Sequence, residues 1–483
     1  MIDAFPFAGY SVGILGLGRS GLATALAMIK SNVEVYAWDD DENARKIAAS
    51  QGVTIQNLMQ LDWREVPTLI AGPGVPLTHP EPHPVIKKVL SEGAEVIGDI
   101  EVLGRTERNS AYIGITGTNG KSTTTSLLGH IMQLAGREIQ LGGNLGTPAL
   151  ELMPMGSDGT FILEMSSYQL DLTKSITFDV AVLLNISPDH LDRHGDMDGY
   201  IKAKRQIFNR QTDPRTAIIG VDDEHSCKLY NDLSAKAEQR VIAISGLGKI
   251  PGGVYVEDGI LIDDLEGQQT PVCDLKNIHT LPGSHNWQNA AAAFAAARAA
   301  GIQPHVIMAC LNSYPGLVHR QQMLDTVDGI RFINDSKATN VDAASRALGC
   351  YQNIYWIAGG RAKEKNLDGL LDQLGQVKRG FLIGEAADEF AKNLSNKIPL
   401  TMSGTLKQAV ADAVRCAHQD GLENAVVLLS PAAASFDQFD NFEIRGDVFT
   451  DLVEKLDGEH IDPYEDAVQD QVSAVAPQSG GLH

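Results

Sequence analysis

The sequence has few cysteines and no long apolar segment. Its 483 residues include only five cysteines, which are far apart and form no CxxC pair. A scattered, odd number of cysteines argues against a disulfide framework and against a zinc site, and it fits a reducing compartment. No apolar run reaches the roughly 18 residues that a membrane-spanning helix needs. We therefore expect a cytoplasmic protein that does not enter a membrane.

Positive charge is also scarce. The chain has 39 Lys and Arg against 61 Asp and Glu, for a formal net charge of −22. This balance disfavours non-specific binding to nucleic acid or to anionic membranes, both of which need the opposite sign. Small phosphorylated ligands are still possible, because a few local cations and helix N-termini can hold them. The first residues lack the basic segment of a signal peptide, so we expect none.

The order of apolar runs predicts an α/β protein with three domains. At about 150 residues per domain, the length alone suggests this number. In the first hundred residues, apolar strands at 11–15, 33–38 and 68–71 alternate with a helical stretch, as at the start of a doubly wound unit. We assign residues 1–98 to this first, Rossmann-like domain.

Two further regions show the same alternation. Strands are predicted at 110–115, 161–163, 180–184 and 217–220, and a nearly pure Ala helix at 290–300, which indicates a central parallel sheet in domain 99–316. Apolar runs at 354–358, 380–383 and 425–429 predict a Rossmann-like C-terminal domain, 317–456. Residues 457–483 have six acidic residues and no Lys or Arg, and we expect a disordered tail.

A glycine-rich turn lies between the first predicted strand and helix. The sequence GLGRSG places glycines at Gly16, Gly18 and Gly21. Glycines allow a tight turn and close approach of backbone N–H groups to a phosphate, and acids at 39–41 end the next strand. From the residues alone, three interpretations remain: an NAD site, a site for another nucleotide diphosphate, or a turn that binds nothing.

A second glycine-containing loop, TGTNGKST at residues 116–123, is a stronger signal. Its backbone N–H groups can cradle phosphates, Lys121 can reach the β and γ oxygens, and Ser122 or Thr123 can meet Mg²⁺. The strict P-loop pattern needs glycine where this chain has Ile115, so the loop is a variant. An exposed lysine after glycine rarely helps packing, which disfavours a purely structural loop.

Polar residues at the ends of later strands are further candidates. Glu164 ends an apolar strand, where a carboxylate can hold Mg²⁺ or can simply be solvated. His190 follows the next strand, together with Asn185 and two aspartates, and is as readily structural as functional. By itself, Lys204 is a cation on a helix face.

Three more clusters are ambiguous from the residues alone. Asn286 can cap the Ala-rich helix, while Asn289, one turn inside it, could face a base. The run NDSKATN at 334–340 is either a solvated loop or a site at a strand end. Three phenylalanines in the run from Ser435 to Phe442 form local core or wall a ligand.

Six of these segments together resemble the Mur ligases. They occur in the order typical of that family: TGTNGKST, LEMSSYQLD, LNISPDHLDRH, LPGSHNWQNA, NDSKATN and SPAAASFDQFDNFEIRG. The resemblance covers about residues 8–456. The last two segments are similar to the branch that adds D-glutamate. Asp40-Asp41 stands where that branch often has Thr-Arg, and Gly72 stands where it often has serine.

The resemblance implies three domains that hold a UDP-substrate, ATP and an amino acid, in that order. It implies ATP-dependent amide-bond formation through an acyl phosphate in the synthesis of peptidoglycan precursors, with two Mg²⁺ ions. The expected partners are UDP-N-acetylmuramoyl-L-alanine, D-glutamate and ATP, with no nucleic acid and no membrane. We expect a monomer.

The resemblance also implies roles for individual residues. ATP would meet Gly117, Thr118, Asn119, Gly120, Lys121, Ser122, Thr123, Asn289, Arg320 and Asp335. The UDP-substrate would meet Gly18, Arg19, Ser20, Asp39, Asp40, Gly74, Asn144, Ser166, Gln169 and His190. D-Glutamate would meet Lys337, Thr339, Lys363, Ser435 and Phe442. The expected catalytic residues are Lys121, His190, Lys204 and Lys337.

The implied metal ligands include a modified lysine. Ser122 and Glu164 would hold one Mg²⁺, and His190 and Lys204 the second. Lys204 falls at the family's carbamylated lysine, and a carbamate can bind a metal where an ammonium cannot.

Other functions remain as alternatives. The glycine-rich turn alone would suit a nicotinamide-dependent oxidoreductase, although such an enzyme needs neither the second loop nor acids for Mg²⁺. A regulatory P-loop ATPase would hydrolyse nucleotide regardless of amino acids. Among ligases, a folylpolyglutamate-type enzyme is the main alternative, and the two C-terminal segments disfavour it.

Overall fold

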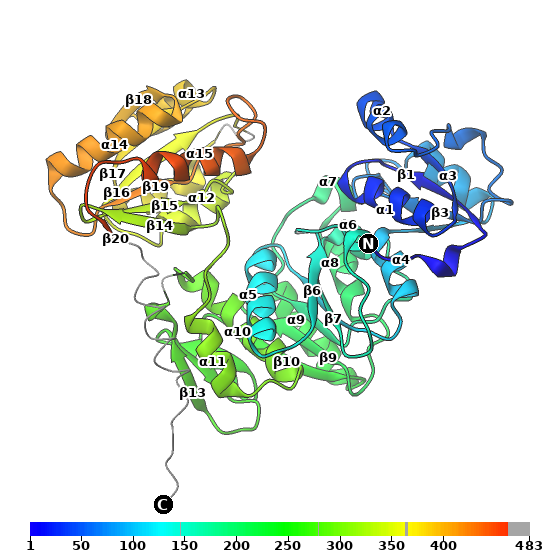
Figure 1. Ribbon diagram of the computed structural model, residues 1–483. Helices are drawn as coiled ribbons and strands as arrows, with labels where there is room; N and C mark the ends of the chain where they lie inside the picture. The colour runs from blue at the N-terminus through cyan, green and yellow to red at the C-terminus, as the bar shows by residue number, and fades with distance from the viewer. Residues whose placement is uncertain (145, 279, 363–365, 462–483) are drawn as a thin grey trace, which may run out of the picture. The chain divides into compact units, whose positions relative to one another are not determined.

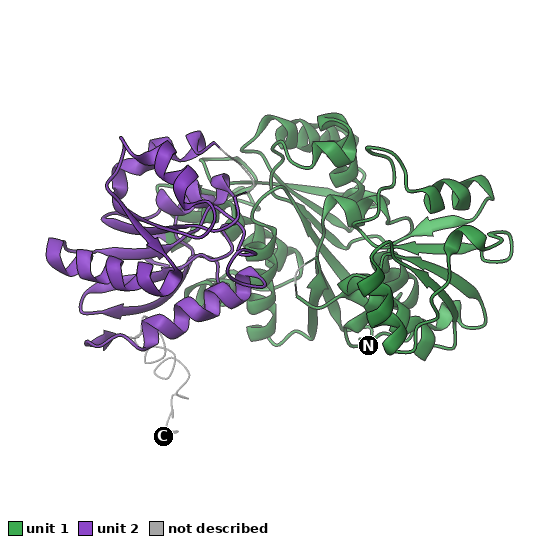
Figure 2. Cartoon of the chain, turned by 90° about the horizontal axis from the view of Figure 1, so that it is seen from above, with its two compact units in different colours: residues 1–275, 286–312 green, residues 276–285, 313–483 purple. Residues whose placement is uncertain are grey.

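The computed structural model describes residues 1–144, 146–278, 280–362 and 366–461, in which helices alternate with the strands of three sheets (Figure 1). The chain forms two compact units (Figure 2). The first contains residues 1–275 and 286–312, and the second contains residues 276–285 and the chain from Ser313 onward. Within the described residues, no helix is both long and apolar enough to cross a membrane.

The first sheet has four parallel strands in the order β2-β1-β3-β4. The central strands β1 and β3 are buried on both faces, whereas β2, at the edge, fully buries only alternate residues. The elements of this region are 3-10 helix Phe5–Phe7, β1 (Ser11–Leu15), α1 (Arg19–Lys30), β2 (Glu34–Trp38), α2 (Glu42–Ser50), 3-10 helix Leu58–Gln60, β3 (Thr68–Ala71), α3 (Pro84–Ser91), β4 (Glu95–Ile97) and α4 (Asp99–Thr106).

The second sheet has nine strands in the order β13-β12-β11-β10-β9-β8-β5-β7-β6. The strands from β5 to β11 run parallel, whereas β12 and β13 join as antiparallel strands. The strands are β5 (Ala111–Thr116), β6 (Ile139–Gly143), β7 (Thr160–Glu164), β8 (Val180–Leu183), β9 (Thr216–Gly220), β10 (Arg240–Ser245), β11 (Val254–Glu257), β12 (Ile260–Asp263) and β13 (Thr270–Asp274).

The helices beside this sheet include α5 and α10, which carry four of the ten predicted ATP residues. They are α5 (Lys121–Leu134), 3-10 helix Ala149–Glu151, α6 (Ser167–Asp171), α7 (Leu191–His194), α8 (Met197–Arg205), 3-10 helix Gln206–Phe208, α9 (Glu224–Lys236), 3-10 helix Leu275–Asn277, α10 (Ser284–Ala299) and α11 (Pro304–Asn312). Helix α10 begins at Ser284, so it extends further toward the N-terminus than the Ala-rich run at 290–300. Asn286 and Asn289 therefore lie within its first turns and are buried.

The third sheet has seven strands in the order β18-β17-β16-β19-β15-β14-β20, of which β14 and β20 are antiparallel to their neighbours. Its elements are β14 (Gln322–Val327), β15 (Ile330–Asn334), α12 (Val341–Leu348), β16 (Ile354–Gly359), 3-10 helix Asp368–Gln376, β17 (Val377–Ile383), α13 (Ala387–Leu394), β18 (Leu400–Gly404), α14 (Leu406–Asp420), β19 (Val426–Leu429), α15 (Phe442–Glu454) and β20 (His460–Ile461).

The start of the predicted tail differs from the expectation. Residues 457–461 are described, and two of them form β20, which pairs with β14. His460 contacts Asp325 through Nδ1 at 2.5 Å and Leu456 O through Nε2 at 2.9 Å, so local polar contacts hold this segment against the sheet. The rest of the predicted tail, 462–483, lies outside the described residues. Each sheet otherwise falls within one predicted domain range, and the boundaries at 98, 316 and 456 stay predictions.

The glycine-rich turn between β1 and α1 depends on two of its glycines. Gly16 has φ of 91°, a left-handed conformation that favours glycine. A Cβ on Gly21 would lie 1.8 Å from the carbonyl oxygen of Gly16, so the first turn of α1 packs against the loop without room for a side chain. Gly18, the residue before α1, has open space instead.

We therefore expect Gly21→Ala to be destabilising and Gly18→Ala to be nearly neutral for stability. A Cβ at position 21 forces the loop and helix apart, an overpacking cost of roughly 1–3 kcal/mol. Thermal unfolding of the two variants checks this difference. Equal melting temperatures would show that the close approach of Gly21 to Gly16 is not a constraint.

Candidate active site

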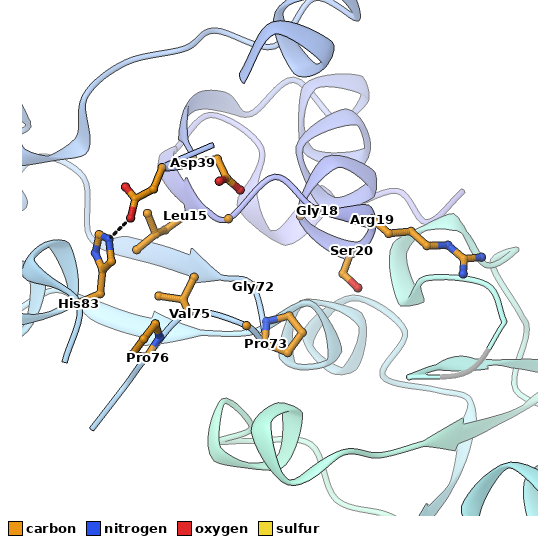
Figure 3. Close-up of a pocket in the computed structure, with 14 residues that line it drawn as sticks. Leu15, Gly18, Arg19, Ser20, Asp39, Gly72, Pro73, Val75, Pro76 and His83 are labelled. Carbon is orange, nitrogen blue, oxygen red and sulfur yellow. Dashed lines mark hydrogen bonds and ion pairs between the residues drawn. The ribbon is translucent and has the colours of Figure 1, made fainter. Parts of the chain in front are cut away.

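A cavity of about 450 Å³ opens at the carboxyl edge of the first sheet (Figure 3). It lies where the strand order reverses between β1 and β3, the usual place for a nucleotide in such folds. Its volume suits a small-molecule ligand. Its lining contains six of the ten predicted UDP-substrate residues, namely Gly18, Arg19, Ser20, Asp39, Asp40 and Gly74.

The three acids after β2 take different roles around this cavity. Asp39 accepts hydrogen bonds from the backbone N–H of Leu17 at 2.6 Å and of Asp41 at 2.8 Å, so it stabilises the glycine-rich turn. The Asp41 side chain caps α2. Asp40 is 75% exposed and lies 3.2 Å from Nε2 of His83, a lining residue that the sequence did not single out.

The predicted phosphate-binding loop lies between β5 and α5, as expected. Gly120 precedes the helix with φ of 85°, and a Cβ there would lie 2.1 Å from Oδ1 of Asn289. The ammonium group of Lys121 donates to the carbonyl oxygens of Gly117 at 2.9 Å and Thr118 at 2.8 Å. Its Nζ thus lies folded over the loop, within reach of any phosphate that the loop holds.

Lys204, on α8, reaches the same loop. Its Nζ donates to the carbonyl oxygen of Gly117 at 2.7 Å and lies 4.7 Å from the ring centroid of Tyr200. The residue is only 1% exposed. Burial, reinforced by the charge of Lys121, holds the pKa of Lys204 well below its usual value.

Glu164 lies at the end of β7 and is only 2% exposed. One carboxylate oxygen, Oε1, accepts a hydrogen bond from Asn144 Nδ2 at 2.6 Å. The other, Oε2, is buried and makes no hydrogen bond in the described part of the chain. A buried carboxylate oxygen without a partner is costly, and a bound cation would satisfy it.

Several of the predicted residues near α6, α7 and α10 already contact other side chains of the protein. Ser166 and Gln169 bond to each other in a capping box at the start of α6. His190 is half exposed, has φ of 52°, and lies 3.3 Å from Asp189 through Nε2. Asn289 accepts from Thr124 and donates to Asn286, so its side chain faces α5 and its own helix.

In the second unit, Lys337 and Phe442 come together. The Lys337 Nζ lies 3.7 Å from the centroid of the Phe442 ring, a cation–π contact. Asp335 is buried and accepts from Ser430 Oγ at 2.8 Å and from the backbone N–H of Gln321 at 3.1 Å. Burial raises the pKa of Asp335 to about 7.

Arg445 is a structural residue of this cluster that the sequence did not single out. It is buried, and it donates to Ser336 Oγ at 3.0 Å, to Ser336 O at 2.7 Å and to Ala433 O at 3.1 Å. Burial lowers the pKa of Arg445 to about 10. The guanidinium therefore joins α15 to the loops after β15 and β19, which carry Lys337 and Ser435. The signal available in the sequence was an arginine within the segment FEIRG, which belongs to the last of the family-like segments.

Comparison with known proteins gives the family. Residues 115–297 match the model of the Mur ligase middle domain. The UDP-N-acetylmuramoylalanine–D-glutamate ligase of Rhodospirillum rubrum is 48% identical over 461 residues, covering 94% of this chain and 97% of that protein. Proteins of the same name from Phenylobacterium zucineum and Caulobacter vibrioides are 46% and 47% identical, covering 94% of this chain and 98% of each relative. The chain belongs to the Mur ligase family.

Solved structures agree with the fold of this Mur ligase. The UDP-N-acetylmuramate-alanine ligase MurC of Thermotoga maritima aligns with a TM-score of 0.55 at 15% identity, covering 92% of this chain and 99% of that one. MurF ligase of the same organism, solved in complex with ADP, aligns with a TM-score of 0.53 at 18% identity, covering 77% and 91%. The predicted α/β fold with three sheets is confirmed. The relatives give no support to the oxidoreductase, regulatory ATPase or folylpolyglutamate alternatives.

In this Mur ligase the predicted residues form three local groups. The first lines the cavity at the glycine-rich turn. The second surrounds the loop at 117–123 and contains Lys121, Ser122, Glu164, Asn144, Lys204 and Asn289. The third contains Asp335, Lys337, Ser435 and Phe442, with Arg320 and the half-buried Thr339 nearby in the same unit. Lys363 lies outside the described residues.

The donor set fits magnesium at Glu164. Mg²⁺ prefers carboxylate and hydroxyl oxygens and keeps several waters. The unpartnered Oε2 of Glu164 is such a ligand. Within the described ranges, no three His, Cys, Asp or Glu side chains cluster as a metal site, so the protein alone does not enclose an ion there.

The buried Asp335 predicts a pH-dependent stability. Its folded-state pKa of about 7 is raised from 3.8, so the native state holds the proton more tightly than the unfolded chain. The stability that the protonated carboxyl contributes is full below pH 4 and is lost as the pH rises to about 7. Asp335→Asn should therefore raise the melting temperature at pH 8 more than at pH 5. Asp372→Asn, at an exposed aspartate, is the control, and an equal effect of Asp335→Asn at both pH values would contradict the prediction.

Proposed function

We propose that this chain joins D-glutamate to UDP-N-acetylmuramoyl-L-alanine at the expense of ATP, with ADP and phosphate as the other products. The observation that carries the proposal is the end-to-end match to relatives of that name, at 44–48% identity over 94–95% of the chain. The loop at Lys121 and the nucleotide-sized cavity at the glycine-rich turn support it. This reaction belongs to the synthesis of peptidoglycan precursors.

The chemistry has two steps. A carboxylate oxygen of the substrate's alanine attacks the γ-phosphorus of ATP, and the bond to the β–γ bridging oxygen breaks, which gives an acyl phosphate and ADP. The amine of D-glutamate then attacks the acyl carbon, loses a proton, and expels phosphate from the tetrahedral intermediate. Negative charge develops on oxygens in both steps, so positioning and electrostatic stabilisation do most of the catalysis.

The UDP-substrate fits the cavity at the first sheet. The N-terminus of α1 and the backbone N–H groups of the glycine-rich turn suit the diphosphate. Asp40 and His83, at the mouth, suit polar atoms of the nucleoside. The other predicted contacts of this substrate, Asn144, Ser166, Gln169 and His190, would meet its sugar and alanine ends. Because Ser166 and Gln169 bond to each other, a substrate that uses either must compete with the cap of α6.

ATP fits the loop at 117–123. Its β and γ oxygens would replace the carbonyls of Gly117 and Thr118 as acceptors for Lys121. We assign Asn289, Arg320 and Asp335 to the remainder of the nucleotide. A bound Mg²⁺, held by Ser122 and Glu164, would neutralise charge on the phosphates. A second ion would use His190 and a carbamylated Lys204.

Lys204 suits carbamylation because its depressed pKa leaves the neutral amine at lower pH than usual. The amine nitrogen would bond to the carbon of CO₂ and release one proton, which turns a buried cation into an anion. Buried ammonium groups without a carboxylate partner are unfavourable, so the modification would relieve that cost.

D-Glutamate fits the cluster of Lys337, Thr339, Ser435 and Phe442, together with Lys363. The Lys337 ammonium would move from the Phe442 ring to a carboxylate. Arg445 fixes the two loops that carry these residues. A monomeric state and a cytoplasmic location stay predictions.

We expect Lys121→Ala to abolish phosphate release while UDP-substrate binding stays near normal. Its ammonium group donates to the carbonyl oxygens of Gly117 and Thr118, whereas the cavity of the first sheet is lined by residues between Leu15 and His83. Phosphate release is measured with ATP, Mg²⁺ and UDP-N-acetylmuramoyl-L-alanine, in the presence of D-glutamate, L-glutamate, L-lysine or diaminopimelate in turn. Calorimetry gives the substrate affinity. Wild-type turnover with none of the amino acids would end the proposal, and turnover only with L-glutamate would revise it.

Lys204→Ala should lower kcat by about a hundredfold or more, since it removes a group beside the reacting phosphates. Lys202→Ala, which removes an exposed cation on the same helix, should have no effect. Partial recovery of the alanine variant by added acetate would be specific to a lost carboxylate. Full activity of Lys204→Ala would refute both the carbamate and its catalytic role.

A further inference from the structure

A chain of hydrogen-bonded side chains, two amides and a carboxylate, runs along the carboxyl edge of the second sheet, from the phosphate-binding loop to the end of β10. It consists of Asn185, after β8, Gln288, on α10, and Asp222, after β9. We propose that Gln288, oriented by Asp222, is a positioning residue that sets the shape of the phosphate-binding loop through Asn185. This inference rests on the proposed function, since it concerns how that loop receives ATP.

The link to the loop is made by Asn185. Its Oδ1 accepts from the backbone N–H of Asn119 at 2.9 Å, and its Nδ2 donates to the carbonyl oxygen of Asn119 at 3.3 Å. The side chain thus pairs with both backbone groups of this one residue, as a neighbouring strand would. The backbone adds a second contact, since Thr118 N–H donates to Asn185 O at 2.9 Å. The conformation between Gly117 and Gly120 depends on where Asn185 lies.

Gln288 holds Asn185 from the other side. Its Oε1 accepts from Asn185 Nδ2 at 2.9 Å, and its Nε2 donates to Asp222 Oδ2 at 2.9 Å. The residue is only 7% exposed, so these hydrogen bonds compete little with water. Its amide is therefore held at both ends.

Asp222, the acceptor at the end of this series of hydrogen bonds, determines how the amides of Gln288 and Asn185 are oriented. An ionised carboxylate only accepts hydrogen bonds, so Asp222 forces the NH₂ group of Gln288 toward itself. The Gln288 oxygen must then face Asn185, whose own NH₂ turns to meet it. This leaves Asn185 Oδ1 as the acceptor for the Asn119 N–H. An amide chain without the carboxylate could adopt the reverse order, in which Asn119 N–H would face a donor.

Asp222 is itself well held. It accepts from Ser245 Oγ, and from the backbone N–H of Gly246 at 2.8 Å. The following residue, Asp223, faces elsewhere: it caps α9 and accepts from Ile186 N at 3.1 Å. Asp222 is thus the carboxylate that faces Gln288, and the end of β10 fixes its position.

Two glycines make room for Gln288. A Cβ on Gly220, at the end of β9, would lie 2.8 Å from Gln288 Nε2 and 1.9 Å from Leu184 O. A Cβ on Gly246 would lie 2.8 Å from Gln288 N. The ends of two neighbouring strands therefore leave the space that this one side chain fills. Neither the general P-loop pattern nor the predicted contacts to ATP include this arrangement.

The first test replaces Gln288 with methionine, which has a similar shape but no hydrogen bonds to Asn185 and Asp222. Loss of the hydrogen bond that positions Asn185 should raise KM for ATP, and the dissociation constant for ATP with Mg²⁺, about three- to tenfold. KM for the UDP-substrate and for D-glutamate should not change. Gln211→Met is the matched control, because Gln211 is a buried glutamine that bonds to Phe178 O and Thr216 O, away from the loop. It should lower the melting temperature without changing KM for ATP.

The second test uses charge. Gln288→Glu places two carboxylates side by side, and such a pair keeps one proton to an unusually high pH. At pH 6 the shared proton restores the donor to Asp222, and KM for ATP should be near that of the wild type. As the pH rises to 9 the proton is lost, the groups repel, and KM should rise. Adding Asp222→Asn removes the second carboxylate and should abolish this pH dependence.

The outcomes separate this inference from the proposed function. An unchanged KM and dissociation constant for ATP in a folded Gln288→Met variant would overturn it. So would a flat pH profile for Gln288→Glu, or a profile that persists in the double variant. If the wild-type protein binds ATP but ligates no amino acid, the proposed function fails, and ATP binding by calorimetry still decides the role of Gln288.

Discussion

The carbonyl oxygen of Gly117 accepts hydrogen bonds from two lysine side chains, Lys121 and Lys204. Two ammonium groups that converge on one backbone oxygen repel each other, and one of them is almost fully buried. The fold can hold them together because the loop carbonyls, the Tyr200 ring and the sheet edge keep both side chains in place. The positive charge of the two ammonium groups would attract phosphate oxygens to this point of the protein.

This local arrangement explains why the net charge of −22 says little about the ligands. Salt screens surface charges, so acids more than about 10 Å away contribute little to the electrostatic field at the loop. A ligand at the loop is governed instead by Lys121, by Lys204 and by whatever cation satisfies the buried oxygen of Glu164. Carbamylation of Lys204 would reverse the sign of one of these three contributions. The site would then need metal ions to stay attractive to ATP.

Many strands could be predicted from the sequence, because parallel strands buried on both faces appear in it as short continuous apolar runs. The strands at 11–15 and 68–71 were predicted with the bounds that the structure has. β6 was missed because IQLGG is a half-exposed edge strand with two glycines. The hairpin strands β12 and β13 were also missed, since their pairing is antiparallel and partly exposed. The ordered residues 460–461 depend on a contact with Asp325, far away in sequence.

The site was predictable at the level of motifs, and its hydrogen bonds were not. Glycine spacing and a lysine at a strand-to-helix junction identify a phosphate loop, because that chemistry is local in sequence. The contacts of Arg445 and Gln288 join residues 109 and 103 positions apart, and no local pattern encodes them. The acids after β2 also show the limit: of three adjacent aspartates, Asp39 and Asp41 accept from backbone N–H groups, whereas the exposed Asp40 pairs with His83.

That exposed aspartate has a consequence for inhibitor selectivity. The branch often has Thr-Arg where this chain has Asp40-Asp41, so the mouth of the nucleotide cavity here carries an acid with a histidine beside it. A uridine mimic with an amine aimed at Asp40 would gain a charge-assisted hydrogen bond in this protein. A ligase with threonine at this position, as the Thr-Arg pair implies, would lack that carboxylate. One pair of residues thus offers a route to compounds that distinguish this ligase from others of its family.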